Sequence, residues 1–250
     1  MDKETMEKPE IIKTGIINAS EKLWPFIFVI DTSETMQGET IAAINKCMRE
    51  FFICLREMQK EKLYILYSIG ILQINNEAKW ITDSLVPIFE LLWDDFDAGQ
   101  TAMYGKALDS LNEKMSRHAL FSAGSKIREP VLLFFVGGKS NDDYEGPLAR
   151  LKTNGWFQHS HRVVISMPGA DEKLGRSVVN NVDDIFRIDS INELDGLAET
   201  LLRYLTDLDI APSRIDRDYE EDEAFRQEYQ ETYSDDDLFG DFDFDDLPFL

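Results

Sequence analysis

The chain has 250 residues, of which 43% are hydrophobic, and it carries a formal net charge of −22. A chain of this length and composition can bury the core of one large α/β domain that carries an appendage. The strong negative charge disfavours binding to nucleic-acid phosphates and to anionic membrane surfaces. The expected partners are therefore proteins, with basic proteins among them.

The sequence has no segment that predicts insertion into a membrane. No stretch approaches the roughly twenty apolar residues that a membrane-spanning helix needs. The N-terminal leader, residues 1–20, begins with polar residues of mixed charge and lacks the basic and then apolar layout of a secretory signal. We therefore expect a cytoplasmic protein.

The first half of the chain alternates apolar runs with an amphipathic segment. Residues 23–30 form a nearly continuous apolar run, which is typical of a strand covered on both faces of a parallel sheet. Apolar residues recur at spacings of three and four over 39–60, which predicts a long amphipathic helix. Residues 63–74 and 78–83 flank turn residues and predict an antiparallel hairpin at one edge of the sheet.

The second half continues the alternation and predicts a parallel-dominated α/β sheet with right-handed crossovers. In such open sheets, ligands bind beyond the carboxyl ends of the strands. The predicted helices cover residues 103–115, 147–154, 172–179 and 191–205. The predicted strands cover residues 131–136, 162–166 and 185–188. This domain is expected to span residues 21–210.

Oxygen-bearing side chains follow the first predicted strand directly. Asp31, Ser33 and Thr35 lie between the apolar run and the long helix. Carboxylate and hydroxyl oxygens suit a hard divalent cation such as Mg²⁺. Ser and Thr are also preferred residues at helix N-termini, so Ser33 or Thr35 could instead cap the helix that follows.

Two motifs carry a resemblance to a known family. Asp-Thr-Ser-Glu-Thr at 31–35 and Gly-Gln-Thr-Ala-Met-Tyr-Gly-Lys-Ala-Leu at 99–108 resemble the von Willebrand factor A (VWA) family, and most closely its bacterial TerY-like branch. The resemblance implies a Rossmann-like fold with a central, mostly parallel six-stranded sheet, one antiparallel edge strand and helices on both faces. It also implies a metal-ion-dependent adhesion site that binds Mg²⁺, Mn²⁺ or Ca²⁺. The implied ligands are Asp31, Ser33, Thr35 and Thr101.

The chain departs from the family pattern at one further ligand. The family reads Thr-Asp-Gly after a later strand, whereas Val136 and Gly137 stand here where Thr and Asp are expected. The loss of an acid weakens the site, because the positive end of a nearby helix dipole repels a cation. Asp142 or Asp143, further along the same loop, could supply a substitute carboxylate. The resemblance thus implies a degenerate site, and both a retained metal and a metal-free crevice are open at this point.

The functional expectation from the resemblance is a non-enzymatic protein-interaction module, in which a partner's carboxylate completes the coordination of the metal. TerY-like proteins are associated with bacterial stress response and tellurite resistance and with kinase and phosphatase partners, and the resemblance implies the same setting here. The sequence lacks a Gly-rich phosphate loop, a Gly-x-Ser-x-Gly elbow and a His-Glu-x-x-His helix. Gly138-Lys139-Ser140 is similar to the end of a phosphate loop, but Leu133 stands where the first glycine is required.

An acidic segment, residues 211–250, follows the domain. From Asp216 onward it contains fifteen acids and two arginines, a net charge of −13, and its composition cannot build a core of its own. Its apolar residues would be a liability if they were exposed, so we expect them to dock on a partner or on the domain itself. The predicted contact residues are Phe239, Phe242, Phe244, Leu247, Phe249 and Leu250.

Two alternatives to the interaction module concern this acidic segment. It could simply be a solubilising extension, which is the usual meaning of a charge run. The chain could also be a scaffold, assembly or autoregulated subunit whose C-terminal segment docks on another subunit, while the crevice no longer binds metal.

Overall fold

The computed structural model describes residues 22–62, 65–116, 119–121 and 126–210. The predicted leader at 1–20 and the acidic segment at 211–250, including its six predicted contact residues, lie outside the described residues. In the ranges that the structure describes, no helix is long and apolar enough to cross a membrane.

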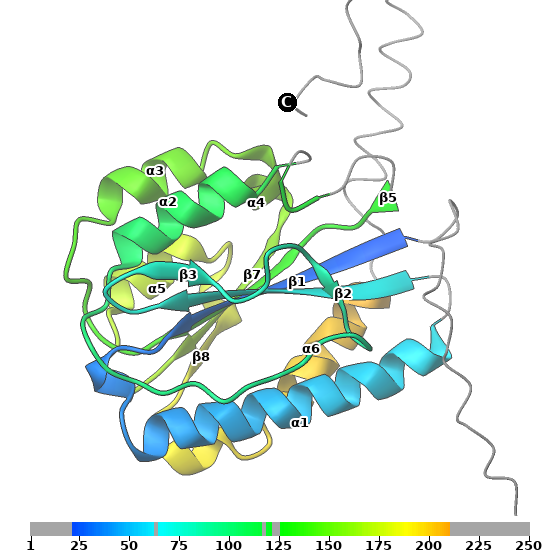
Figure 1. Cartoon of the computed structure of the whole chain (residues 1–250), viewed down its shortest axis with the longest axis horizontal. Helices are drawn as coiled ribbons and strands as arrows, with labels where there is room; N and C mark the ends of the chain where they lie inside the picture. The colour runs from blue at the N-terminus through cyan, green and yellow to red at the C-terminus, as the bar shows by residue number, and fades with distance from the viewer. Residues whose placement is uncertain (1–21, 63–64, 117–118, 122–125, 211–250) are drawn as a thin grey trace, which may run out of the picture.

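A mixed sheet forms the centre of the molecule (Figure 1). Its main strands are β1 (Lys22–Asp31), β2 (Ile65–Ile74), β3 (Ala78–Trp80), β6 (Val131–Val136), β7 (His161–Ser166) and β8 (Ile185–Arg187). They follow the order β3-β2-β1-β6-β7-β8, in which β3 is antiparallel to β2 and the other neighbours are parallel. The predicted parallel-dominated sheet with one antiparallel edge strand is confirmed. Two short strands were not predicted: β4 (Val86–Pro87) pairs with β2, and β5 (Lys126–Ile127) pairs with β1.

Helices cover both faces of the sheet, as predicted. Figure 1 shows α1 (Glu39–Glu61) and α6 (Leu197–Ile210) on one face, and α2 (Tyr104–Lys114) and α3 (Glu145–Leu151) on the other. The shorter helices α4 (Gly155–His159) and α5 (Glu172–Val178) bury side chains in the same core as α2. Three 3-10 helices complete the described elements: η1 (Glu34–Met36), η2 (Val182–Asp184) and η3 (Ile191–Leu194).

Strand β1 is buried on both faces because successive side chains point to opposite sides of the sheet. Phe26, Phe28 and Ile30 belong to the core that includes α1 and α6, while Ile27 and Val29 belong to the core that includes α2. This double burial explains the unbroken apolar run in the sequence. It also places the end of β1, where Asp31 stands, at the middle of the sheet.

The last predicted helix, 191–205, is wrong as a single element. The chain forms η3 first, then passes through Gly196 and enters α6. Gly196 has a φ of 85°, a left-handed conformation that glycine adopts without steric cost and that interrupts a helix. Helix α4 was not predicted; the side chain of Asn154 accepts hydrogen bonds from the first backbone amides of this helix and so fixes its start.

The aromatic cluster between β1 and α1 generates a stability prediction. The Phe28 ring lies 5.5 Å from the Phe51 ring and 5.3 Å from the Phe52 ring, measured between centroids. Removing a fully buried ring loses both transfer free energy and packing, so Phe28→Ala should lower the free energy of unfolding by about 3–5 kcal/mol. Denaturant unfolding measures this value. Ile53→Ala on the exposed side of α1 is the control and should change it by less than about 0.5 kcal/mol; equal effects would contradict the described packing.

Candidate metal site

Three loops meet at the carboxyl ends of β1 and β6. The loop after β1 is joined to the loop before α2 by a hydrogen bond from Glu34 N to Gln100 O, at 2.8 Å. The loop before α2 is joined in turn to the loop after β6, because Asn141 N donates to Ala102 O at 2.8 Å and Asn141 Oδ1 accepts from Ala102 N at 2.9 Å. We call these three joined loops the rim. The two sequence motifs therefore converge at one edge of the sheet, where parallel strands of this topology place their binding sites.

Asp31 lies at the centre of the rim and is fully buried. Its Oδ1 accepts a hydrogen bond from Ser33 N at 2.8 Å. Its Oδ2 accepts from the Tyr104 hydroxyl at 2.6 Å, from Gly137 N at 3.1 Å and from Gly138 N at 3.3 Å. A buried carboxylate is costly unless hydrogen bonds satisfy it, and here four donors do so.

Tyr104 was not identified from the sequence as a site residue. It is the first residue of α2 and is 2% exposed. Burial and the charge of Asp31 raise the pKa of the Tyr104 hydroxyl well above its usual value, so the group stays protonated and donates. One feature of the sequence could have identified Tyr104 as a site residue. It lies in the second motif, directly before Gly105, and carries the hydroxyl at the start of a helix face that is otherwise apolar.

Ser33 and Thr35 present a pair of hydroxyls at the start of η1. Their Oγ and Oγ1 atoms lie 3.0 Å apart and share one hydrogen bond, in which either hydroxyl can be the donor. Ser33 is 2% exposed, whereas Thr35 is exposed. The capping alternative is wrong for the long helix, because Gly38 occupies the N-cap of α1. Ser33 stands at the N-cap of η1, but within the described chain its side chain makes no capping hydrogen bond.

Thr101 lies on the loop before α2 and is exposed. Its neighbour Gln100 has a φ of 70°, a left-handed conformation that is uncommon for a residue with a side chain. This conformation accompanies the hydrogen bond from Glu34 N to the Gln100 carbonyl, which holds the two loops together. Thr101 thus belongs to the same rim as Ser33 and Thr35.

At Gly137, where the sequence resemblance implies an acid, a side chain would require its neighbours to shift. A Cβ atom at Gly137 would lie 2.3 Å from Met36 Sδ, 2.8 Å from Asp31 Oδ2 and 2.9 Å from Met36 Cγ. Met36 is fully buried in the first core. The space next to Gly137 is therefore filled by the Met36 thioether.

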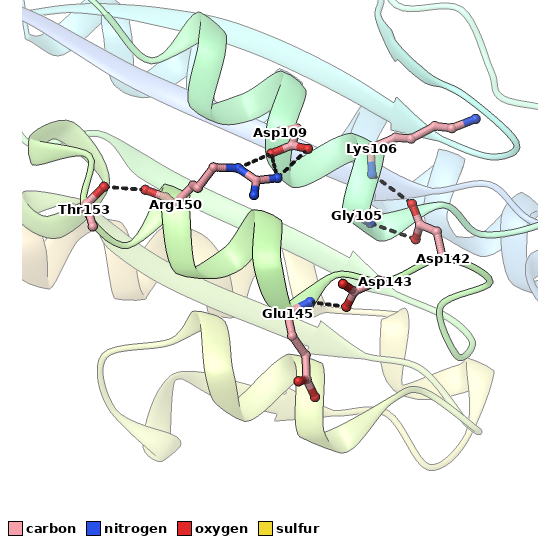
Figure 2. Close-up of polar contacts among 8 residues, drawn as sticks. All are labelled: Gly105, Lys106, Asp109, Asp142, Asp143, Glu145, Arg150 and Thr153. Carbon is pink, nitrogen blue, oxygen red and sulfur yellow. Dashed lines mark hydrogen bonds and ion pairs between the residues drawn. The ribbon is translucent and has the colours of Figure 1, made fainter.

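The two predicted substitute ligands lie at helix N-termini (Figure 2). Asp142 Oδ1 accepts from Gly105 N at 2.8 Å, and its Oδ2 accepts from Lys106 N at 3.0 Å, so this carboxylate caps α2. Asp143 Oδ1 accepts from Glu145 N at 3.0 Å and lies at the start of α3. Asp143 lies shortly before the helix that it contacts, which is a local sequence signal, whereas Asp142 caps a helix that begins earlier in the chain and has no such signal. Across the described residues, no group of three or more His, Cys, Asp and Glu side chains is arranged to hold a metal.

The capping role of Asp142 generates a second stability prediction. Asp142→Ala should lower the free energy of unfolding by about 1 kcal/mol, because two amides of α2 lose their acceptor and the helix dipole loses a negative charge. Denaturant unfolding again gives the value. Asp94→Ala, which removes an exposed acid from a loop, is the matched control. A cost no larger than that of the control would argue against the cap.

Comparisons with solved structures support the fold, while no protein-family model and no curated protein matches the sequence. Proximal thread matrix protein 1 from the mussel byssus, solved with a zinc-occupied metal-ion-dependent adhesion site, is 12% identical with a TM-score of 0.52, over 76% of this chain and 47% of that one. A von Willebrand factor type A protein from Catenulispora acidiphila is 13% identical with a TM-score of 0.50, over 72% and 42%. The pilus adhesin SpaC from Lactobacillus rhamnosus GG is 10% identical with a TM-score of 0.55, over 73% and 30%.

This chain therefore spans about half or less of the length of these structures. At such low identity the likeness concerns the fold alone. The sheet order, the antiparallel edge strand and the helices on both faces agree with it. The described residues have the Rossmann-like fold of a VWA domain.

Proposed function

We propose that this chain is a non-enzymatic protein-interaction module that binds a protein partner at the rim. The VWA fold is a general type of protein-interaction module, and the observation that carries the proposal is the convergence of three loops at the carboxyl edge of its sheet. Backbone hydrogen bonds join these loops before any partner arrives, so binding would cost little ordering of the rim.

The exposed groups of the rim suit recognition by hydrogen bonds. Close to the hydrogen bonds that join the three loops, the exposed side chains carry hydroxyls, amides and charges of both signs. They are Glu34, Thr35, Gln37, Gln100, Thr101, Lys139, Asn141 and Asp143. A partner segment with backbone or carboxylate groups could pair with these donors and acceptors.

The biological setting follows from the sequence resemblance. We infer a cytoplasmic protein in a bacterial stress-response system of the tellurite-resistance type, with kinase- or phosphatase-associated partners. The second candidate is a scaffold or autoregulated subunit that binds through the acidic segment 211–250. The observation that favours it is the set of six large apolar residues within a strongly acidic sequence.

Charge-bearing substitutions at the rim test the first candidate against the second. The wild-type full chain and the variants Thr35→Arg and Thr101→Arg serve as three baits, and the partner proteins that each bait captures from a native lysate are quantified. If partners bind at the rim, each bulky cation should reduce the recovery of specific partners at least roughly tenfold, which corresponds to the loss of about 1.4 kcal/mol. Thr206→Arg, at an exposed position on α6, is the matched control and should leave recovery unchanged.

A bait that lacks residues 211–250 separates the alternatives. Recovery that survives the truncation but falls in the rim variants supports the proposed function. Recovery that is lost on truncation and unaffected by the rim variants overturns it in favour of the acidic segment. Increased recovery after truncation, still sensitive to Thr35→Arg, indicates that the acidic segment covers the rim.

A further inference from the structure

The hydroxyl pair of the rim, taken alone, is compatible with a divalent cation. An octahedral Mg²⁺ with metal–oxygen distances of roughly 2.1 Å places adjacent ligand oxygens about 3.0 Å apart. The Ser33 Oγ and Thr35 Oγ1 atoms have this separation, 3.0 Å. The two hydroxyls of the first loop thus have the spacing of two adjacent ligands in an octahedral metal site.

The carboxylates of the rim do not fit a cation. Asp31 Oδ2 already accepts three hydrogen bonds, and the shortest of them, 2.6 Å, comes from the Tyr104 hydroxyl. A cation bound to this oxygen would displace buried donors. These donors would lose their hydrogen bonds without gaining others, which costs free energy. The side of the site where the family places its second acid is filled by Met36, whose Sδ atom would lie 2.3 Å from a Cβ on Gly137.

The two acids of the loop after β6 accept hydrogen bonds at the N-termini of helices. Asp142 binds two amides of α2 and the Ser140 hydroxyl, and Asp143 binds an amide of α3. Mg²⁺ and its relatives bind through carboxylates, and each carboxylate near a helix N-terminus matters because the dipole opposes the cation. The acids that the resemblance offers as ligands or substitutes are thus all engaged by donors of the protein, and this set of residues does not fit the metal that the fold family implies.

We propose that the Tyr104 hydroxyl and the backbone amides of Gly137 and Gly138 take the place of the metal ion, so that this rim keeps its shape without a cation. These donors come from α2 and from the loop after β6, and they converge on the one carboxylate at the end of β1. They stabilise the charge of Asp31 by hydrogen bonding and tie the three loops together. The rim is consequently indifferent to chelators, whichever partner it binds.

The test uses the full chain and follows thermal unfolding in EDTA and in millimolar Mn²⁺, together with the electron paramagnetic resonance signal of bound Mn²⁺. The wild type should show the same melting temperature in both solutions and should bind no more Mn²⁺ than Ser33→Ala, which discounts ions attracted by the many other carboxylates of the chain. Tyr104→Phe removes only the hydroxyl and should lower the melting temperature in EDTA by roughly 5 °C, because Asp31 loses its shortest hydrogen bond. Tyr144→Phe, at another buried tyrosine in the same core, is the matched control and should melt like the wild type.

A gain of metal response distinguishes a substitute for the cation from a merely structural hydroxyl. Without the Tyr104 hydroxyl, Asp31 Oδ2 has room for a new ligand, so Mn²⁺ should recover part of the lost stability in Tyr104→Phe. The phenyl ring of Tyr104→Phe could itself exclude the ion. Tyr104→Leu has no ring and repeats the test without this obstruction. Adding Ser33→Ala should abolish the recovery.

Three results would overturn the proposal. The first is a wild-type melting temperature that rises by more than about 2 °C in Mn²⁺ and loses this rise in Ser33→Ala. The second is a Tyr104→Phe variant as stable as the wild type in EDTA. The third is the absence of any Mn²⁺ response in both Tyr104→Phe and Tyr104→Leu.

Discussion

The hydrogen bonding of one buried carboxylate organises the candidate site. Asp31 ends the central strand and has no access to solvent, so its charge must be met by donors from the protein. The donors come from the loop after β1, from α2 and from the loop after β6. A carboxylate in this position therefore couples three segments that are far apart in the sequence, and the geometry of the rim depends on all of them.

The packing around this carboxylate explains the glycines that follow β6. The amides of Gly137 and Gly138 approach Asp31 Oδ2 closely, which a side chain at Gly137 would prevent. A Cβ at Gly138 would likewise lie 2.9 Å from Thr35 Cγ2. Glycine at both positions thus lets two loops touch, and Met36 seals the remaining space from the side of the first core. Glycine at 137 is accordingly required by the close packing of Met36 and Asp31 around it.

Much of the fold could be predicted because its signals are local. Strand β1 is buried on both faces, so its sequence is an unbroken apolar run. In α1, apolar residues recur with helical spacing over six turns. The break between η3 and α6 was missed because the apolar spacing continues across it, while the interruption depends on the left-handed backbone at Gly196. Strands β4 and β5 were missed because two residues carry no periodic pattern.

The site could be predicted only in part, because its decisive contacts are tertiary. The motif that contains Asp31, Ser33 and Thr35 located the first loop, and the second motif located Thr101. The hydrogen bond from Tyr104 to Asp31 spans 73 positions of sequence and has no local signature. Likewise, a five-residue offset along one loop made Asp142 a plausible ligand, whereas the folded chain uses its carboxylate to cap a helix that lies earlier in the sequence.

Anomalous diffraction from a crystal of the full chain soaked in Mn²⁺ tests the central claim most directly, because it shows the ion and the Asp31 contacts together. We expect no anomalous peak beside Ser33 and Thr35, and we expect the Tyr104 hydroxyl to remain hydrogen-bonded to Asp31 Oδ2. A peak within coordination distance of these hydroxyls, with Tyr104 turned away from Asp31, would contradict this claim.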